Sequence, residues 1–347
     1  MRKLILYSKT VIFIMLLLMV IPAVGEIDVS DIRFGTVQPA SSLASLLRSK
    51  FSEVNGMVLR YMADPSGKVY YVDGNKSSAG NGTSWSSAYN TLSAAMAKSH
   101  ADIAVSSRRA WATRNTIFVI GDAITEDLTK LAQKTDVIGL GSYNQYKQAG
   151  VMGAHVIEAA TTAHYMGCRL INLHFRDDGA GGILFDIPIN QNGIEFIGCD
   201  FQSNATDTIG LRLGGCHDTK ITNCTFRTNT SGVGFSTAAI QILSGAGSLT
   251  NVNISGNQIN AGAGVGIDWN ETNSINCWIT NNYIHSTAAM GIDTDDEAGV
   301  MVYDNRILTS GLAQADDTSN DFNILYAGNN IVTGSTGTLY IPTFTDD

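Results

Sequence analysis

The chain is poor in charge, and the shortage of positive charge is greatest in its second half. Charged residues make up 15% of the 347 residues. No lysine follows Lys220, and from Ile221 onward only Arg227 and Arg306 oppose twelve Asp or Glu, a local charge of −10. Such a surface repels nucleic acid and anionic membranes. It suits cations, neutral glycans, or anionic glycans bridged by a metal.

Cysteine and histidine are also too sparse and irregular to indicate a known type of site. The five cysteines are an odd number without regular spacing, which excludes a small disulfide scaffold and a structural zinc site. Four histidines, His155, His164, His174 and His285, are scattered without metal spacing. His217 and Asp218 in "GGCHDTK" are interpreted as a turn before a strand rather than as a catalytic pair.

Long apolar runs are absent after the first 25 residues. "MRK" is basic, "VIFIMLLLMV" is a short apolar core, and Ala23 and Gly25 are the small residues that a signal peptidase needs. We therefore expect residues 1–25 to be a cleaved secretory signal, too short to span a membrane stably. The alternative is an uncleaved N-terminal anchor. In both cases the sequence predicts a secreted or cell-surface protein, and after signal cleavage no membrane contact is expected.

A six-residue phrase recurs seven times, and this is the strongest pattern in the sequence. The 35 glycines and many Asn and Thr already favour a turn-rich all-β protein. The phrase has apolar residues at its first and sixth positions, and it begins at Leu170, Phe196, Ile221, Ile254, Ile279, Val302 and Tyr326. The fourth position is occupied in turn by Leu173, Cys199, Cys224, Asn257, Asn282, Asn305 and Asn329.

A period in the twenties indicates a solenoid. The phrases hold too few leucines for a leucine-rich repeat, so a parallel β-helix is predicted. The first and sixth positions should point inward, stacking on their equivalents about 4.8 Å along the axis. We expect the fourth position to adopt the left-handed bend and the four asparagines to form a ladder. Cys199 and Cys224 would lie on adjacent coils, either as a disulfide or as two buried thiols.

A second column supports the first. The segments that begin at Gly182, Gly210, Ala239, Gly266 and Gly291 alternate with a period of two. Their second residues, Ile183, Leu211, Ile240, Ile267 and Ile292, are expected inward, and their third residues, Leu184, Arg212, Gln241, Asp268 and Asp293, outward. Residues 227–237 and 244–248 are interpreted as insertions that bulge from a coil.

The segment 69–101 carries a resemblance to a known superfamily. Its "VYYVDG", its glycine-rich stretch with Trp85 and the helix expected from about Ser86 are similar to the first segment of secreted or viral right-handed β-helix proteins of the pectin-lyase-like superfamily. The resemblance covers roughly residues 68–335. It implies a right-handed β-helix with an N-terminal capping helix, whose inner face would hold Ala88, Leu92, Ala95 and Met96. It implies no activity, because the superfamily holds lyases, hydrolases, epimerases, tailspikes and adhesins.

Two end segments are predicted in addition to the coils of a β-helix domain at residues 68–347, one before the domain and one at its C-terminal end. Residues 26–67 form a helical or linker segment, in which 41–62 has helical apolar spacing. This helix would pack on the β-helix or mediate oligomerisation. At the other end, residues 338–344 are expected to cover the last coil, which favours a monomer.

The best candidate site is an acidic face. Asp268 and Asp293 should lie on adjacent coils with carboxylates about 5 Å apart. Asp295 and Asp296 follow nearby, with Glu271 and Glu297 beside them. Three interpretations stay open: Asp268, Asp293 and Asp295 as catalytic carboxylates of a glycoside hydrolase, Asp268, Asp293, Asp295 and Asp296 as a Ca²⁺ site, or ordinary solvated acids.

No complete catalytic motif accompanies these acids. A lyase needs a base and a group that neutralises the uronate, and Arg212 is about two coils, or roughly 10 Å, from Asp268. The Gly-His-Gly phrase of polygalacturonase-like hydrolases is absent. The sequence therefore predicts an adhesin-like or fibre-like β-helix that binds polysaccharide or cell-envelope glycan, with a polysaccharide-processing enzyme as the alternative.

Overall fold

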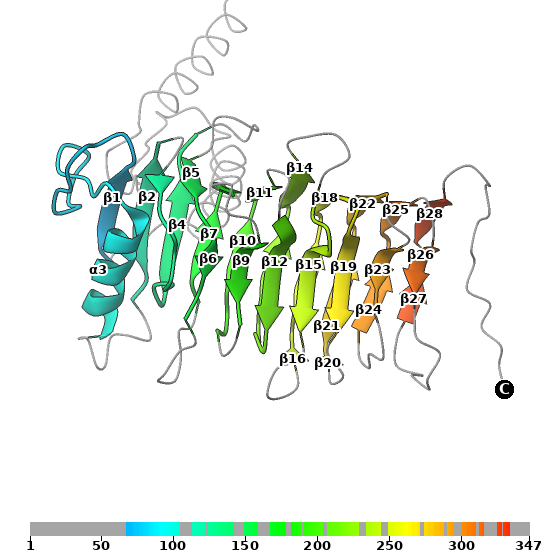
Figure 1. Cartoon of the computed structure of the whole chain (residues 1–347). Helices are drawn as coiled ribbons and strands as arrows, with labels where there is room; N and C mark the ends of the chain where they lie inside the picture. Colours follow the sequence, from blue (N-terminus) through cyan, green and yellow to red (C-terminus); the bar gives the residue numbers. More distant parts are fainter. Residues whose placement is uncertain are drawn as a thin grey trace, which may run out of the picture. The chain divides into compact units, whose positions relative to one another are not determined.

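The chain folds into a parallel β-helix, in which coils of backbone stack along one axis (Figure 1). The computed structural model describes residues 67–104, 113–121, 124–141, 149–158, 167–177, 182–188, 191–203, 207–228, 234–243, 249–270, 274–287, 290–294, 300–309, 312–315, 325–327 and 329–333. The coils from β4 to β26 pass through three sheets in the order A, B and C, and all strand pairs are parallel. This confirms the predicted all-β, right-handed parallel β-helix.

The strands of each sheet follow one another along the axis. Sheet A contains β1 (Val69–Asp73), β2 (Asn115–Ile120), β4 (Thr135–Gly139), β7 (Arg169–Ile171), β10 (Glu195–Ile197), β13 (Lys220–Thr222), β17 (Asn253–Ser255), β21 (Cys277–Thr280), β24 (Val300–Tyr303) and β27 (Leu325–Ala327). Sheet B contains β3 (Ile124–Thr125), β5 (Ala149–Met152), β8 (Leu173–Arg176), β11 (Asp200–Ser203), β14 (Thr225–Thr228), β18 (Gln258–Gly262), β22 (Tyr283–Ser286), β25 (Arg306–Thr309) and β28 (Asn330–Thr333). Sheet C contains β6 (His155–Val156), β9 (Gly182–Ile187), β12 (Asp207–Gly214), β15 (Ala238–Leu243), β19 (Val265–Asn270), β23 (Met290–Asp293) and β26 (Leu312–Ala315), while β16 (Leu249–Thr250) pairs with β20 (Ser274–Ile275).

The repeated phrase forms the corner between sheets A and B, and its apolar positions fill the core as predicted. Phe196 is the strand partner of both Leu170 and Ile221, and all three side chains are fully buried. At the sixth position, the rings of Phe175, Phe201 and Phe226 stack with centroid distances of 5.3 and 4.6 Å. Three isoleucines, Ile259, Ile284 and Ile307, continue this column. Stacked aromatic rings contribute beyond the apolar area that they bury.

The predicted asparagine ladder is present. Asn282 Nδ2 donates to the Ile254 carbonyl at 2.9 Å, and its Oδ1 accepts from the backbone N–H of Asn257 at 3.0 Å. Asn305 repeats this pattern towards Asn282, and Asn329 towards Asn305. The ladder thereby satisfies backbone groups that burial at the corner would otherwise leave unpaired.

The left-handed residue of the corner is the third of the phrase, not the fourth as we expected. Positive φ angles of 52 to 69° occur at Asn172, Gly198, Asn223, Gly256, Asn281 and Asp304. One such residue turns the chain from sheet A into sheet B. The next side chain, at the fourth position, then points inward, where its amide reaches the backbone of neighbouring coils.

The two cysteines of the fourth column are buried free thiols. Cys199 Sγ donates to the Leu170 carbonyl at 3.2 Å, which corresponds to the bond that Asn257 Nδ2 makes to the Ile221 carbonyl. Burial raises the pKa of the Cys224 thiol, so it stays protonated at neutral pH. The thiols thus take over part of the role of the asparagine amide.

The second column is confirmed except at its first strand. Leu211, Ile240, Ile267 and Ile292 are partners and fully buried. On β9, however, the partner of Leu211 is Phe185, two residues beyond Ile183, and Leu184 is buried rather than exposed. An irregularity between Asp207 and Ile209 shifts the register there, which the sequence pattern does not reveal.

The N-terminal segment is confirmed as a cap, with one correction to the start of its helix. β1 pairs along its whole length with β2, so the β-helix begins at Val69. The helix α3 spans Leu92–Ala104 and begins later than Ser86, because the preceding residues bond to the free edge of β1. Tyr71 N donates to the Gly82 carbonyl and Asp73 N to that of Tyr89. Such pairing protects an edge strand against unwanted association.

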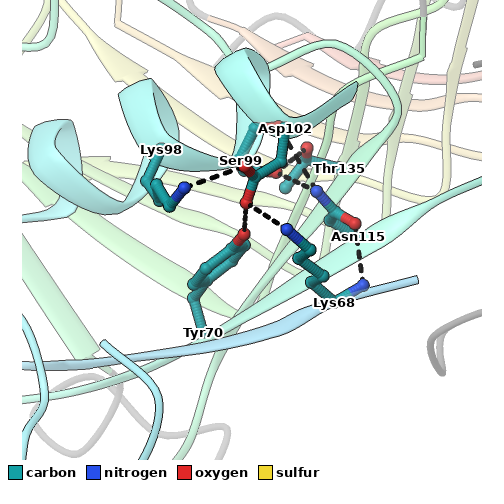
Figure 2. Close-up of polar contacts among 7 residues, drawn as sticks. All are labelled: Lys68, Tyr70, Lys98, Ser99, Asp102, Asn115 and Thr135. Carbon is teal, nitrogen blue, oxygen red and sulfur yellow. Dashed lines mark hydrogen bonds and ion pairs between the residues drawn. The ribbon is translucent and has the colours of Figure 1, made fainter. Parts of the chain in front are cut away.

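Side chains fix α3 at both ends. At its start, the Glu126 carboxylate accepts from the Leu92 and Ser93 backbone N–H groups at 2.5 and 3.0 Å. These donors have no partner inside a helix, and a carboxylate there also suits the helix dipole. Further along, Ser99 Oγ lies 2.7 Å from Thr135 Oγ1, so the helix is bound to strand β4 of the first coils (Figure 2).

Asp102 forms a second anchor near the end of α3. Figure 2 shows Tyr70, Lys68 and Lys98 around its carboxylate, with the two lysines at 3.0 and 2.8 Å. Burial alone would raise the pKa of Asp102, but these partners outweigh burial and lower it to about 2. Burial and Asp102 in turn raise the pKa of Tyr70.

Several predictions fall outside the described residues and stay predictions. These concern the signal at 1–25, the segment 26–67 with its helix at 41–62, the terminal cap at 338–344, and the insertion at 244–248. Within the part of the chain that the structure describes, no helix is long and apolar enough to cross a membrane.

Candidate functional site

The two central carboxylates of the predicted site lie together on the outer face of sheet C. Asp268 on β19 is the strand partner of Asp293 on β23, so they occupy adjacent coils as predicted. Asp293 is only 8% exposed, whereas Asp268 is partly exposed. Asp295 and Asp296 lie outside the described residues, so their position near Asp268 and Asp293 stays a prediction.

Asp268 and Asp293 are the end of a longer row of polar residues. The same column continues through Gln241, Arg212 and Asp186 on successive strands. We call these five residues the sheet C ladder. It contains two carboxylates, an amide, a guanidinium and a third carboxylate at the regular spacing of the coils, about 4.8 Å. Arg212 and Asp268 are partly exposed, and the other three are at most 9% exposed.

Hydrogen bonds orient the ladder residues. Arg212 donates to both Asp186 oxygens at 2.9 and 2.6 Å, a bidentate ion pair that raises the pKa of the guanidinium. Gln241 Nε2 donates to Asp268 Oδ2 at 2.7 Å, and Asn270 Nδ2 donates to Oδ1 at 2.6 Å. These contacts hold the polar groups in fixed directions, which lowers the entropic cost of binding a ligand.

The ladder does not form the site that a lyase needs. Arg212 is turned towards Asp186, away from Asp268, so it is already engaged by a carboxylate. Lys220, the last lysine of the chain, lies on sheet A, where it pairs with Glu195. A proton-abstracting base and a uronate-neutralising group are therefore not assembled at the ladder among the described residues.

The calcium prediction stays untested. Among the residues that the structure describes, no group of three or more His, Cys, Asp or Glu could hold a metal ion. Two of the four predicted ligands, Asp295 and Asp296, belong to the segment 295–299, which is not described. Asp268 and Asp293 alone supply too few oxygens for Ca²⁺, which takes about six to eight.

A second polar cluster, on the outer face of sheet B, was missed in the sequence. His174, Asp200, Gln202 and Arg227 come from β8, β11 and β14, and all are at most 8% exposed. Arg227 donates to both oxygens of Asp200, and His174 Nε2 lies 3.0 Å from Gln202 Oε1 and 3.5 Å from Asp200 Oδ2. Burial lowers the pKa of His174, although Asp200 opposes the shift.

The signal for this cluster was present but faint. Alternation after the repeated phrase places His174, Asp200 and Arg227 outward, and Asp200 and Arg227 have opposite charges on neighbouring coils. Their pairing is diagonal, because the strand partner of Arg227 is Gln202. Burial of every member is typical of a structural ion-pair network. The sheet C ladder differs in that Arg212 and Asp268 are partly exposed, although its other three members are buried as well.

The remaining candidates from the sequence, the other histidines and Asp218, lie at separate places in the fold and form no common site among the described residues. His155 is fully buried, and its Nδ1 accepts from Leu128 N at 3.1 Å. His217 Nδ1 lies 3.0 Å from Thr250 Oγ1, and Asp218 has a positive φ of 52°, which confirms the predicted turn. His285 lies on β22, 3.4 Å from Asn260, and His164 is outside the described residues.

Comparison with known proteins adds distant likenesses only. No family model and no curated protein sequence matches the chain. The structure of DFA-IIIase from Arthrobacter chlorophenolicus A6 without its lid matches with a TM-score of 0.44 and 14% identity, over 76% of this chain and 72% of that one. A pectate lyase matches with a TM-score of 0.39 and 13% identity over 77% of each chain. The Dettilon tailspike protein gives a TM-score of 0.36 and 14% identity, over 75% of this chain and 50% of the tailspike. The fold assignment rests on the strand register itself, and these likenesses assign no activity.

Proposed function

We propose that this protein is a secreted or cell-surface β-helix that binds a polysaccharide or a cell-envelope glycan along the sheet C ladder. The observation that supports this most is the ladder's five polar residues on five successive strands, ending in Asp268 and Asp293. A repeating row of fixed donors and acceptors complements a ligand that is itself a repeating chain of hydroxyl groups. The net charge of −9 disfavours nucleic acid as the partner.

Binding can be tested with a polysaccharide panel by affinity electrophoresis. Asp268→Asn and Gln241→Ala should each weaken retention of the bound glycan about tenfold, because the first replaces a fixed acceptor by a donor and the second removes a fixed amide. Gln258→Ala is the matched control, since Gln258 is an exposed glutamine on sheet B of a neighbouring coil. If no glycan is retained, or if both ladder variants behave as the control does, the proposal is wrong.

The alternative function is hydrolysis of a polysaccharide by Asp268 and Asp293. The adjacent-coil register supports it, because retaining glycosidases place an acid and a nucleophile about 5–5.5 Å apart. Assays for reducing sugar and for uronate absorbance over the same panel distinguish catalysis from binding. Product formation that Asp268→Asn and Asp293→Asn both abolish would establish the alternative, whereas binding without product supports the main proposal.

Calcium would be an addition to this function rather than a requirement. Asp268, Asp293, Asp295 and Asp296 remain its proposed ligands. Calorimetry should detect Ca²⁺ binding, and a chelator should lower the melting temperature, because a ligand that binds only the folded state stabilises it. An absence of heat together with a chelator-independent melting temperature would remove the metal from the account.

A further inference from the structure

A hollow of about 400 Å³ lies beside sheet A, at the turn that precedes its strands. Its size falls in the range of small-molecule sites, roughly 300–1,000 Å³. Gly167 and Gly193 line it, together with charged side chains at both ends. None of these residues belongs to the sheet C ladder, so the hollow is independent of the proposed glycan site.

The hollow exists because two consecutive coils lack a side chain at one position. The turn before each of the six sheet A strands from β4 to β21 contains one left-handed residue. These residues are Lys134, Gly167, Gly193, Asp218, Asn251 and Asn276. Gly167 and Gly193 stack closely, since a Cβ on Gly193 would lie 3.1 Å from the Gly167 nitrogen. The glycines form a floor, and the flanking residues of the column close its two ends.

One end of the hollow is cationic. Arg114 and Lys134 line it, and Arg114 Nη1 donates to the Gly167 carbonyl at 2.7 Å and to Asp136 Oδ1 at 2.6 Å. Arg169 contacts the same Asp136 oxygen at 3.2 Å, so two arginines share one buried carboxylate, and Lys134 lines the same end of the hollow. Burial, and then the nearby Arg114, lower the pKa of Lys134, which means that an anion between these two side chains would be stabilised.

The opposite end of the hollow is anionic. Asp218 lines it and accepts from Asn251 Nδ2 at 2.8 Å, a contact that orients the carboxylate without neutralising it. Glu195 and Lys220 flank the hollow and pair with each other at 3.4 Å, so their charges offset. The negative charge that remains at this end is that of Asp218.

Lys134 has an unfavourable backbone conformation for its residue type. Its φ is 45°, whereas the other members of the column are glycine, aspartate or asparagine, the residues that tolerate positive φ best. The fold would be served better by one of those residues at this position. A strained residue that contributes charge to a hollow is a common feature of binding sites.

We propose that the hollow binds a short peptide with free termini, its carboxylate between Arg114 and Lys134 and its ammonium at Asp218. Lys134 and Asp218 are three coils apart, about 14 Å between Cα atoms. A peptide of two to three residues spans roughly 7–10 Å, and the two side chains cover the remainder. Capture of chain termini by fixed charged groups is an established mode of peptide recognition.

Titration of the full chain with trialanine, followed by calorimetry, tests this proposal. N-acetyl-trialanine lacks the ammonium and trialanine amide lacks the carboxylate, so each should bind about tenfold more weakly than trialanine. Gly193→Asn should abolish binding, because it fills the hollow with a side chain that the same column tolerates two coils further on. Asn276→Gly, in the same column but beyond the hollow, is the matched control and should bind normally.

Lys134→Asn separates a binding role from a structural one. It should weaken trialanine binding about tenfold and at the same time raise the melting temperature, because asparagine relieves the strained conformation. The proposal is overturned if trialanine does not bind the natural chain, if the blocked peptides bind equally well, or if Lys134→Asn leaves the affinity unchanged. None of these results would affect the glycan proposal, whose ladder lies on sheet C.

Discussion

Before Ile254, the corner of each coil is filled by an apolar side chain or a thiol, and from Ile254 onward by an asparagine. The first region combines Leu173, Cys199 and Cys224 with a stack of phenylalanines. The second combines the asparagine ladder with isoleucines. The backbone is the same in both, with one left-handed residue per corner. The comparison shows that the coil geometry requires a buried side chain at this position but not a particular chemistry, because the Leu173 side chain cannot form a hydrogen bond and those of the asparagines can.

The charges divide along the same line. Arg114, Arg169 and Lys220 lie in the first region, while from Ile221 onward the chain is strongly acidic. The cation-lined hollow belongs to the first region, and the acidic end of the sheet C ladder belongs to the second. One solenoid thus offers two surfaces of different charge on different coils.

The largest effect is expected from breaking the aromatic stack. Phe201→Ala should cost about 3–5 kcal/mol of unfolding free energy, since Phe201 packs between Phe175 and Phe226. Ile284→Ala, at the same column position in the second region, should cost less, roughly 2–4 kcal/mol. Denaturant unfolding measures both changes in free energy. Phe118→Ala is the control and should have a small effect, because the side chain of Phe118 is partly exposed. Equal costs for Phe201 and Phe118 would contradict the inward stack.

The next effect compares the two corner chemistries. Asn282→Ala should cost about 2–3 kcal/mol, because it leaves the Ile254 carbonyl and the Asn257 N–H without their partners. Cys199→Ala removes weak thiol contacts to the Leu170 and Ile197 carbonyls and a small volume, and should cost about 1 kcal/mol. Thermal melting of the two variants tests this order. If Cys199→Ala were less stable than Asn282→Ala, the hydrogen bonds of the asparagine ladder would not stabilise the corner as proposed.

A smaller effect distinguishes the third position of the phrase from the fourth. Asn281→Ala should cost about 1 kcal/mol, because alanine is strained at a φ of 56°. Asn281→Gly should be close to neutral, since glycine adopts this φ freely and already occupies Gly256. At Asn282, glycine should be as harmful as alanine. If Asn282→Gly were instead clearly more stable than Asn282→Ala, the left-handed residue would be the fourth of the phrase and not the third.

The smallest effect concerns the N-terminal cap and its dependence on pH. The folded pKa of Asp102 is about 2, below the ordinary value of 3.8. A lowered pKa contributes stability that is present above the unfolded value and lost as pH falls towards the folded value. The natural chain should therefore lose part of its stability between these two pH values. Asp102→Asn should lack this contribution at neutral pH and show a shallower acid dependence, measured by melting from pH 5 to pH 2.

The sequence predicted the coil columns well because each repeats many times. It misplaced the register of β9 because the irregularity near Asp207 leaves no trace in residue type. It assigned the bend to the fourth position because asparagine suits both a left-handed turn and a ladder. The start of α3 was misplaced because Ala88 continues the apolar spacing although it lies before the helix, directly after the turn at Ser86 and Ser87.

The candidate sites also divide into one that follows from the repeat and others that do not. Asp268 and Asp293 were predicted as neighbours because strand alternation fixes their column. The pairing of Arg227 with Asp200 was missed because diagonal contacts depend on side-chain conformation. The hollow beside sheet A was missed because it results from absent side chains, at Gly167 and Gly193, on coils that are far apart in sequence.

The dependence of affinity on glycan length tests the central claim most directly. The sheet C ladder spans four coil intervals, about 19 Å from Asp186 to Asp293. For oligosaccharides of the glycan that the panel identifies, calorimetry should show affinity rising with each added unit until the ligand covers this distance, and then levelling off. Asp268→Asn should shorten the ligand length at which the plateau begins. An affinity that is already maximal for a single sugar unit, or that Asp268→Asn leaves unchanged at every length, would contradict binding along the ladder.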